Sequence, residues 1–128
     1  MLALDVPRPR ETWHTVPGAR LRDWAVQAVE VPTLTVWPGV DVLGKPVHFD
    51  LAAVPHLLVG GTTGSGKSVC LHALLLSLLW RLGPQDLQLT LIAPQRVELA
   101  HYAGFPHLMG SQIIEDIGDT LDALDGLV

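Results

Sequence analysis

The segment GGTTGSGKS at residues 60–68 constrains the fold of this chain more than any other feature. Glycine buries almost no surface and loses more backbone entropy than other residues when it is ordered, so packing alone does not favour such a segment. Its letters match the phosphate-loop pattern of glycine, four residues, glycine, lysine, and then serine or threonine, with Gly61, Gly66, Lys67 and Ser68 at the fixed positions. The segment therefore predicts a turn that binds phosphate groups. The alternative is a flexible glycine turn without a ligand.

Phosphate binding explains why glycine occupies several positions of this pattern. Backbone N–H groups converge on a phosphate only if the loop curls tightly and no side chain intrudes. We expect Gly61 and Gly64 to adopt dihedral angles that other residues avoid, and Gly66 to let the backbone approach the ligand closely. The free N–H groups and the positive end of the dipole of the following helix add to the attraction.

The candidate site consists of the loop and the first residues of that helix. We expect Lys67 to reach the β- and γ-phosphates as the catalytic residue, and the Ser68 hydroxyl to be a ligand of Mg²⁺. The predicted binding residues are Gly61, Thr62, Thr63, Gly64, Ser65, Gly66, Lys67 and Ser68.

Hydrophobic periodicity and turn residues predict an α/β chain. An amphipathic helix over residues 19–30 precedes a small antiparallel hairpin that begins at Thr33. The apolar run 56–59 predicts a buried strand, residues 68–82 a helix buried on more than one side, and residues 87–92 a second strand. Strand, crossover helix and strand in this order predict a right-handed βαβ unit with parallel strands.

The remaining part of the chain is expected to be helical in two places. A short helix should run from Pro94 to about Tyr102, and Asp116 should cap a final helix. The apolar residues on one face of that final helix are Ile117, Leu121, Leu124 and Val128. We divide the chain into a tail and amphipathic helix at 1–32 and a second region at 33–128.

Length and composition limit the classes of function. A chain of 128 residues fits one domain, and a net charge of −5 lacks the basic signature of a nucleic-acid binder. The single cysteine, Cys70, excludes an internal disulfide and suits a reducing compartment. The longest apolar run, Val69 to Trp80, is too short to span a bilayer. We therefore expect a cytoplasmic protein, and the mean hydropathy of +0.35 favours a partner for some of its apolar surface.

From about residue 36 to residue 128 the sequence resembles the motor domain of the FtsK/SpoIIIE DNA translocases, most specifically in the run PHLLVGGTTGSGKSVCLHALLLSLL at residues 55–79. Members of that family are hexameric RecA-like ATPases that pump double-stranded DNA through a central channel in chromosome partition, sporulation and conjugative transfer. The resemblance implies a partial RecA-like P-loop NTPase fold. It also implies that Lys67 and Ser68 hold ATP with Mg²⁺, that duplex DNA is a partner, and that the complete motor is a homo-hexamer.

The chain departs from the family after the second predicted strand. The family reads aspartate, proline, lysine where this chain has Ala93, Pro94 and Gln95. The loss of both charged groups puts efficient hydrolysis, or its coupling to DNA, in doubt. Arg96 and Glu98, which follow, are expected to form ion pairs either across a subunit boundary or on the surface.

The sequence also lacks the apolar strand with adjacent acids that carries the family's Walker B group, so we expect a motor domain truncated before Walker B. Asp116 and Asp119 fall in the final helix and are expected to be capping or solvated groups. The leading hypothesis is the ATP-binding portion of a motor that couples MgATP hydrolysis to movement along double-stranded DNA. The alternative is a non-hydrolysing remnant or interaction module that associates with a complete motor subunit. Whether the chain is itself an enzyme stays open at this point.

Overall fold

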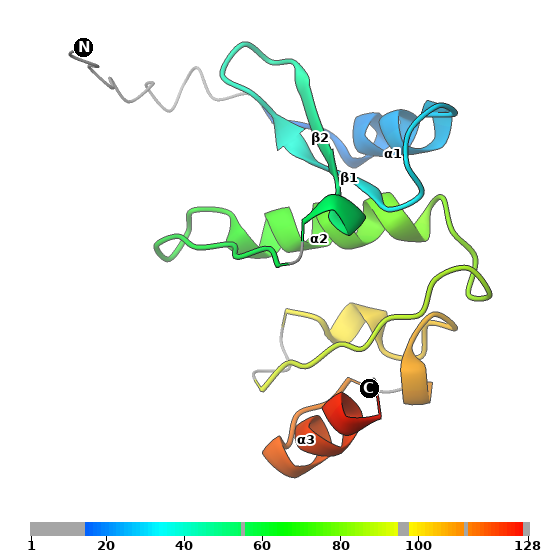
Figure 1. Cartoon of the computed structure of the whole chain (residues 1–128). Helices are drawn as coiled ribbons and strands as arrows, with labels where there is room; N and C mark the ends of the chain where they lie inside the picture. Colours follow the sequence, from blue (N-terminus) through cyan, green and yellow to red (C-terminus); the bar gives the residue numbers. More distant parts are fainter. Residues whose placement is uncertain (1–14, 55, 95–97, 112, 127–128) are drawn as a thin grey trace.

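A computed structural model describes residues 15–54, 56–94, 98–111 and 113–126. The helices and strands, in chain order, are α1 (Gly18–Gln27), β1 (Thr35–Val40), β2 (Pro46–Asp50), α2 (Lys67–Leu79) and α3 (Ile117–Asp125). Short 3₁₀ turns lie at Leu51–Ala53, Ala100–Tyr102 and Met109–Ser111. Helix α2 runs through the middle, with α1 and the hairpin on one side and the chain after residue 84 on the other (Figure 1).

The predicted hairpin is confirmed. Strands β1 and β2 pair antiparallel with Val36 opposite Phe49, and a register shift between Val36 and Gly39 marks a bulge. The turn that joins them is closed by Asp41, whose carboxylate accepts hydrogen bonds from the N–H groups of Leu43 at 2.8 Å and Lys45 at 2.9 Å. Aspartate favours such turns because its short side chain bonds backbone N–H groups a few residues on.

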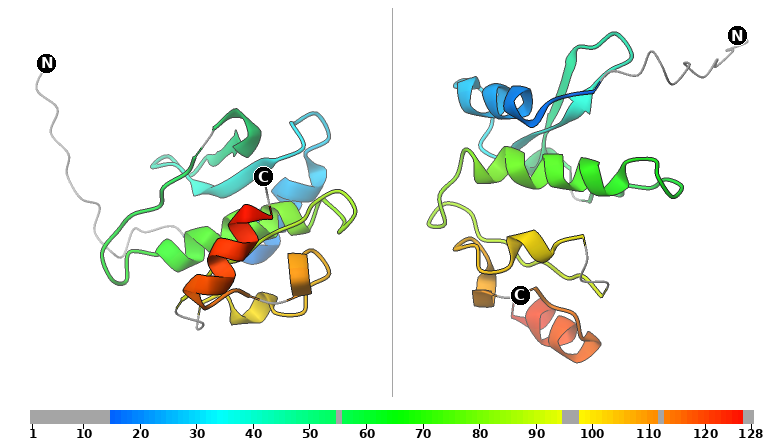
Figure 2. Two further views of the ribbon diagram at one scale, coloured as in Figure 1. Left: turned by 60° about the horizontal axis from the view of Figure 1, so that its bottom comes forward. Right: turned by 180° about the vertical axis from the view of Figure 1, so that it is seen from behind.

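Helix α2 is buried on two sides, as its apolar sequence predicts. On the hairpin side, Leu74 and Leu78 pack with Val36 of β1. On the opposite side, Leu75 packs into a cluster with Leu91, Ala93, Leu99, Tyr102 and Leu108. Figure 2 shows the same order of layers from two further directions. The helix that carries the glycine loop at its start is therefore the central element of the packing.

Polar contacts fix the second half of α2 against β1. The backbone N–H of Trp37 donates to the fully buried Ser77 hydroxyl at 3.1 Å, and that hydroxyl donates to the Ala73 carbonyl at 2.6 Å. Just beyond the helix, the Arg81 guanidinium lies over the Trp37 ring and donates to the carbonyl of Thr35. A buried N–H without a partner is unfavourable, so these contacts favour one position of β1 on α2.

Helix α1 confirms the amphipathic helix predicted at 19–30, although it spans only Gly18–Gln27. Its Leu21 and Ala25 are buried against Trp37, so its role is to cover the hairpin. Helix α3 confirms the predicted cap, because the Asp116 carboxylate accepts a hydrogen bond from the Gly118 N–H at 2.6 Å.

The prediction of a buried strand at 56–59 is wrong. These residues form no strand, and Leu58 is 95% exposed. A strand that is apolar on both faces is stable only with paired neighbours and covering layers. No segment within the described parts of the chain pairs with residues 56–59, so their side chains stay in contact with solvent.

The second predicted strand, residues 87–92, is extended but pairs differently from the prediction. Parallel bridges join Leu89 to Leu108 and Ile92 to Ile114. The Leu89 N–H donates to the His107 carbonyl at 2.7 Å, and the Ile114 N–H donates to the Leu91 carbonyl at 2.9 Å. Its partners therefore follow it in the chain, and a parallel βαβ unit is absent from the described elements.

The short helix predicted from Pro94 to Tyr102 is present only as the 3₁₀ turn Ala100–Tyr102, and residues 95–97 lie outside the described residues. Gly104 follows it with φ of 79°. In the part of the chain that the structure describes, none of the helices is both long enough and apolar enough to cross a bilayer.

Candidate nucleotide-binding site

The glycine loop leads directly into α2 at one end of the helix (Figure 1). Gly64 and Gly66 have φ angles of 77° and 92°, which side chains of other L-residues rarely adopt. Gly66 precedes the first helical residue, Lys67, and its carbonyl accepts from the Cys70 N–H at 2.8 Å. Residues 62–65 form a turn before the helix, in which the Ser65 N–H donates to the Thr62 carbonyl at 3.1 Å. The exposed Thr62 and Thr63 lie in this turn.

The structure corrects the dihedral angle expected for Gly61, which does not have a positive φ. A Cβ at this position would overlap the Ser65 hydroxyl and lie 3.3 Å from Lys67 Cγ, so glycine gives these two side chains room. Gly66 has a positive φ, and a Cβ there would enter open space. The loop therefore curls against Gly61 and leaves an open cradle at Gly64 and Gly66.

Lys67 folds back over the loop. Its ammonium donates to the carbonyl of Gly61 at 2.6 Å and to the carbonyl of Thr62 at 2.9 Å. Two carbonyl dipoles therefore hold the positive charge of Lys67 at the start of the loop. The structure thus brings together Gly61, Thr62, Ser65 and Lys67, as the motif predicts.

Ser68 has a partner that the sequence did not suggest. Its hydroxyl donates to Glu98 Oε1 at 2.6 Å. An ion pair was expected for Glu98, but its proposed partner Arg96 lies outside the described residues. One turn further along α2, His72 Nδ1 and the Tyr102 hydroxyl are 2.9 Å apart, and their rings stack.

The spacing of these contacts is a signal that sequence reasoning overlooked. Ser68 and His72 are four residues apart on α2, and Glu98 and Tyr102 are four apart on the segment facing it. Residues at this spacing share one face of a helical turn. Tyr102 is buried, and burial raises the pKa of its hydroxyl above the usual value for tyrosine, because the charged form is desolvated.

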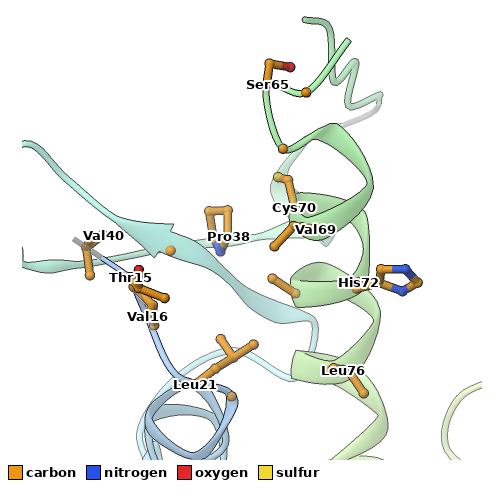
Figure 3. Close-up of a pocket in the computed structure, with 15 residues that line it drawn as sticks. Thr15, Val16, Leu21, Pro38, Val40, Ser65, Val69, Cys70, His72 and Leu76 are labelled. Atoms are coloured by element: carbon orange, nitrogen blue, oxygen red, sulfur yellow. The ribbon is translucent and has the colours of Figure 1, made fainter. Parts of the chain in front are cut away.

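An apolar cavity of about 650 Å³ lies beside the loop, between α2, β1 and the start of α1. Figure 3 shows Pro38 and Val40 on one wall and Val69 and Cys70 on another, with Ser65 at the loop end. Cys70 is half-buried and has no disulfide partner, which agrees with a small packing residue. Gly64, Ser65 and Gly66 of the loop line the same cavity as these apolar side chains.

The donor set fits Mg²⁺ bound through a nucleotide. Among the described residues there is no group of three or more histidine, cysteine or acidic side chains that could hold a metal ion by itself. Magnesium usually takes one or two protein oxygens, several waters and substrate phosphates. The Ser68 hydroxyl and the Glu98 carboxylate are oxygen donors of this kind, whereas Ala93 contributes only a buried methyl group.

A glycine loop closed by a lysine at the start of a helix defines the class of P-loop NTPases. Comparison with protein families refines this class. The model of the FtsK/SpoIIIE family matches residues 20–128 of the chain. The chain belongs to the FtsK/SpoIIIE family, and the resemblance inferred from residues 55–79 is confirmed.

Curated relatives agree with this assignment. The chain is 50% identical over 91 residues to the DNA translocase FtsK of Pseudomonas syringae pv. tomato, in a match that covers 71% of the chain and 11% of the relative. Identity is 48% to the protein of the same name from Pseudomonas putida and 45% to that of Shewanella oneidensis, each over 71% of the chain and over 11% and 10% of the relative. The chain therefore spans about a tenth of the length of these relatives.

Proposed function

We propose that the chain is the ATP-binding portion of a DNA translocase motor, which couples MgATP hydrolysis to movement along double-stranded DNA. The observation that carries this proposal is the position of the Lys67 ammonium, which bonds the Gly61 carbonyl at 2.6 Å and the Thr62 carbonyl at 2.9 Å in the same loop whose Gly64 and Gly66 have positive φ angles. The name of these relatives, DNA translocase, supports DNA as the partner.

The loop residues would act in different ways on a triphosphate. The backbone N–H groups at the start of α2 bind phosphate oxygens, and the helix dipole favours their negative charge. Lys67 exchanges its two carbonyl partners for phosphate oxygens, so the loop needs no large rearrangement. Bound Mg²⁺ would neutralise further phosphate charge, with Ser68 as its protein ligand.

The wider architecture is part of the proposal. We place residues 33–128 in the N-terminal part of a RecA-like core, with residues 1–32 as a preceding tail and helix. The two isolated parallel bridges, Leu89 with Leu108 and Ile92 with Ile114, are compatible with this placement. In this account the complete motor is a hexamer that acts on DNA in the cytoplasm.

Nucleotide binding can be tested by thermal unfolding of the chain with increasing MgATP. A ligand that binds only the folded state stabilises it by about 2.7 kcal/mol at roughly 100 times Kd. We expect a melting temperature that rises with nucleotide concentration in the wild type and stays constant in Lys67→Ala. A wild type that shows no shift at millimolar MgATP would contradict the proposal.

The buried position of Ala93 favours a second candidate, a non-hydrolysing module that associates with a complete motor subunit. Its side chain packs among Leu75 and Leu91, at a position where the family resemblance leads one to expect an aspartate. Gln95 lies outside the described residues. ATP turnover with duplex DNA separates the candidates when it is measured on a complete subunit that contains this segment, because the chain spans only about a tenth of the length of its relatives. A motor gives DNA-stimulated turnover that Lys67→Ala abolishes, whereas the module gives none.

A further inference from the structure

Glu98 places a carboxylate against the serine of the phosphate loop. Its Oε1 accepts the Ser68 hydroxyl at 2.6 Å, although thirty positions separate the two residues. The adjacent Leu99 and the nearby Tyr102 are buried in the cluster on α2, and Tyr102 bonds His72 one turn along the helix. The backbone that carries Glu98 is therefore anchored beside the loop.

A carboxylate in this position opposes the binding of a bare polyphosphate. Like charges separated by a few ångströms repel, and a hydrogen bond from a neutral hydroxyl does not cancel that repulsion. Lys67 forms no ion pair with Glu98, and its ammonium bonds two loop carbonyls instead. A cation between the carboxylate and the phosphates would turn this repulsion into attraction.

We propose that Glu98 is the positioning residue for the divalent cation that accompanies the nucleotide, and that it acts through Ser68 and the water shell of the ion. The proposal rests on the nucleotide-binding function proposed above. Carboxylates that hold metal-bound water or metal ligands change metal affinity by about 10–100-fold when they are replaced. The structure assigns this acid to residue 98, since position 93 on the same segment is a buried alanine.

The test measures the affinity of the chain for ATP by calorimetry, once with excess Mg²⁺ and once with EDTA. In Glu98→Gln we expect the affinity without Mg²⁺ to stay equal or rise a few-fold, because a repulsive charge is removed. We expect the gain in affinity that Mg²⁺ gives to fall by about tenfold or more. Opposite changes under the two conditions are a result that a loss of packing cannot produce.

The matched control is Glu30→Gln. Glu30 is exposed and lies two residues before Pro32, whose carbonyl accepts from Arg81 beyond the far end of α2. We expect this variant to keep the full effect of Mg²⁺. Glu98→Asp, which keeps the charge, should retain more of the effect than Glu98→Gln. Equal losses in these two variants would show that the negative charge at position 98 is not what supports the effect of Mg²⁺, and would overturn the proposal.

The outcomes separate this inference from the function on which it rests. If the wild type and Lys67→Ala bind ATP equally, or neither binds, the nucleotide-binding proposal fails and the role of Glu98 fails with it. If the wild type binds and Lys67→Ala does not, but Glu98→Gln keeps the whole effect of Mg²⁺, only the role of Glu98 is overturned.

Discussion

Gly60 and Gly61 are neighbours in the chain, yet their surroundings differ. A Cβ at Gly61 would overlap the Ser65 hydroxyl, whereas a Cβ at Gly60 would meet no atom within 4 Å. Neither residue has a positive φ. The requirement for glycine at position 61 is therefore one of space within the closed loop, and the same change at the two positions gives a matched comparison.

We expect Gly61→Ala to weaken ATP binding by about tenfold or more, because the methyl group displaces the side chains of Ser65 and Lys67 from their positions in the loop; tenfold corresponds to about 1.4 kcal/mol. Gly60→Ala should change the affinity by less than about twofold. Calorimetric titration with MgATP measures both. Equal affinities in the two variants would show that the curl of the loop against Gly61 has no part in binding.

At the same scale, the sequence predicted the glycine loop and the helix that follows it, whereas the binding roles of the loop residues stay predictions. Spacing alone identified Lys67 and Ser68, because a phosphate loop is a local motif with fixed positions. The dihedral angle of Gly61 was predicted wrongly. The motif does not specify which glycine has a positive φ and which one leaves space for neighbouring side chains. Glu98 was missed as a partner of Ser68 because that contact depends on tertiary packing of distant residues.

Among the elements, α3 is held more by its cap than by its packing. Leu121 and Leu124 on its apolar face are 59% and 48% exposed. At its start, the Asp116 carboxylate accepts from the Gly118 N–H, and Thr120 Oγ1 donates to the Asp116 carbonyl at 2.7 Å. A helix of nine residues is marginal without such contacts.

We therefore expect Asp116→Ala to destabilise α3 by about 0.5–2 kcal/mol, the usual loss for an N-cap. Hydrogen exchange of the α3 amides should become faster while exchange in α2 stays unchanged. The control is Asp125→Ala at the last residue of α3, where a negative charge opposes the helix dipole. That variant should leave α3 equally or more protected; unchanged exchange in Asp116→Ala would show that the cap is dispensable.

The helices and strands also show which structural features can be predicted from the sequence. The hairpin, α1, α2 and the cap of α3 follow from local chemistry, such as the Asp41 turn and the apolar faces of the helices, and each was predicted. The pairing of residues 87–92 was predicted wrongly, because the partner of a β-strand depends on contacts with segments that are distant in the sequence. Leu89 pairs with Leu108 rather than with the run 56–59.

In the whole molecule, α2 joins two packed layers. Leu74 belongs to the cluster with β1, and the next residue, Leu75, belongs to the cluster with residues 91–108. Both side chains are buried. Val69, on the first turn of the same helix, is 71% exposed. The two layers therefore depend on one helix whose exposed end carries the candidate site.

We expect Leu74→Ala and Leu75→Ala each to lower the free energy of unfolding by about 2–5 kcal/mol, because each leaves a cavity in a packed cluster. Val69→Ala should change it by less than about 0.5 kcal/mol. Urea denaturation followed by circular dichroism measures the three values. A loss for only one of the two leucines would mean that one layer contributes little to stability.

The central claim is that residues 61–68 bind the phosphates of a nucleotide, and amide NMR spectra of the chain recorded during titration with MgATP test it most directly. The account predicts that the largest shifts fall on the backbone amides of Gly64, Gly66, Lys67 and Ser68, with smaller shifts in α3, and that Lys67→Ala removes them. Saturating shifts confined to α1 or α3, or none at millimolar MgATP, would contradict it.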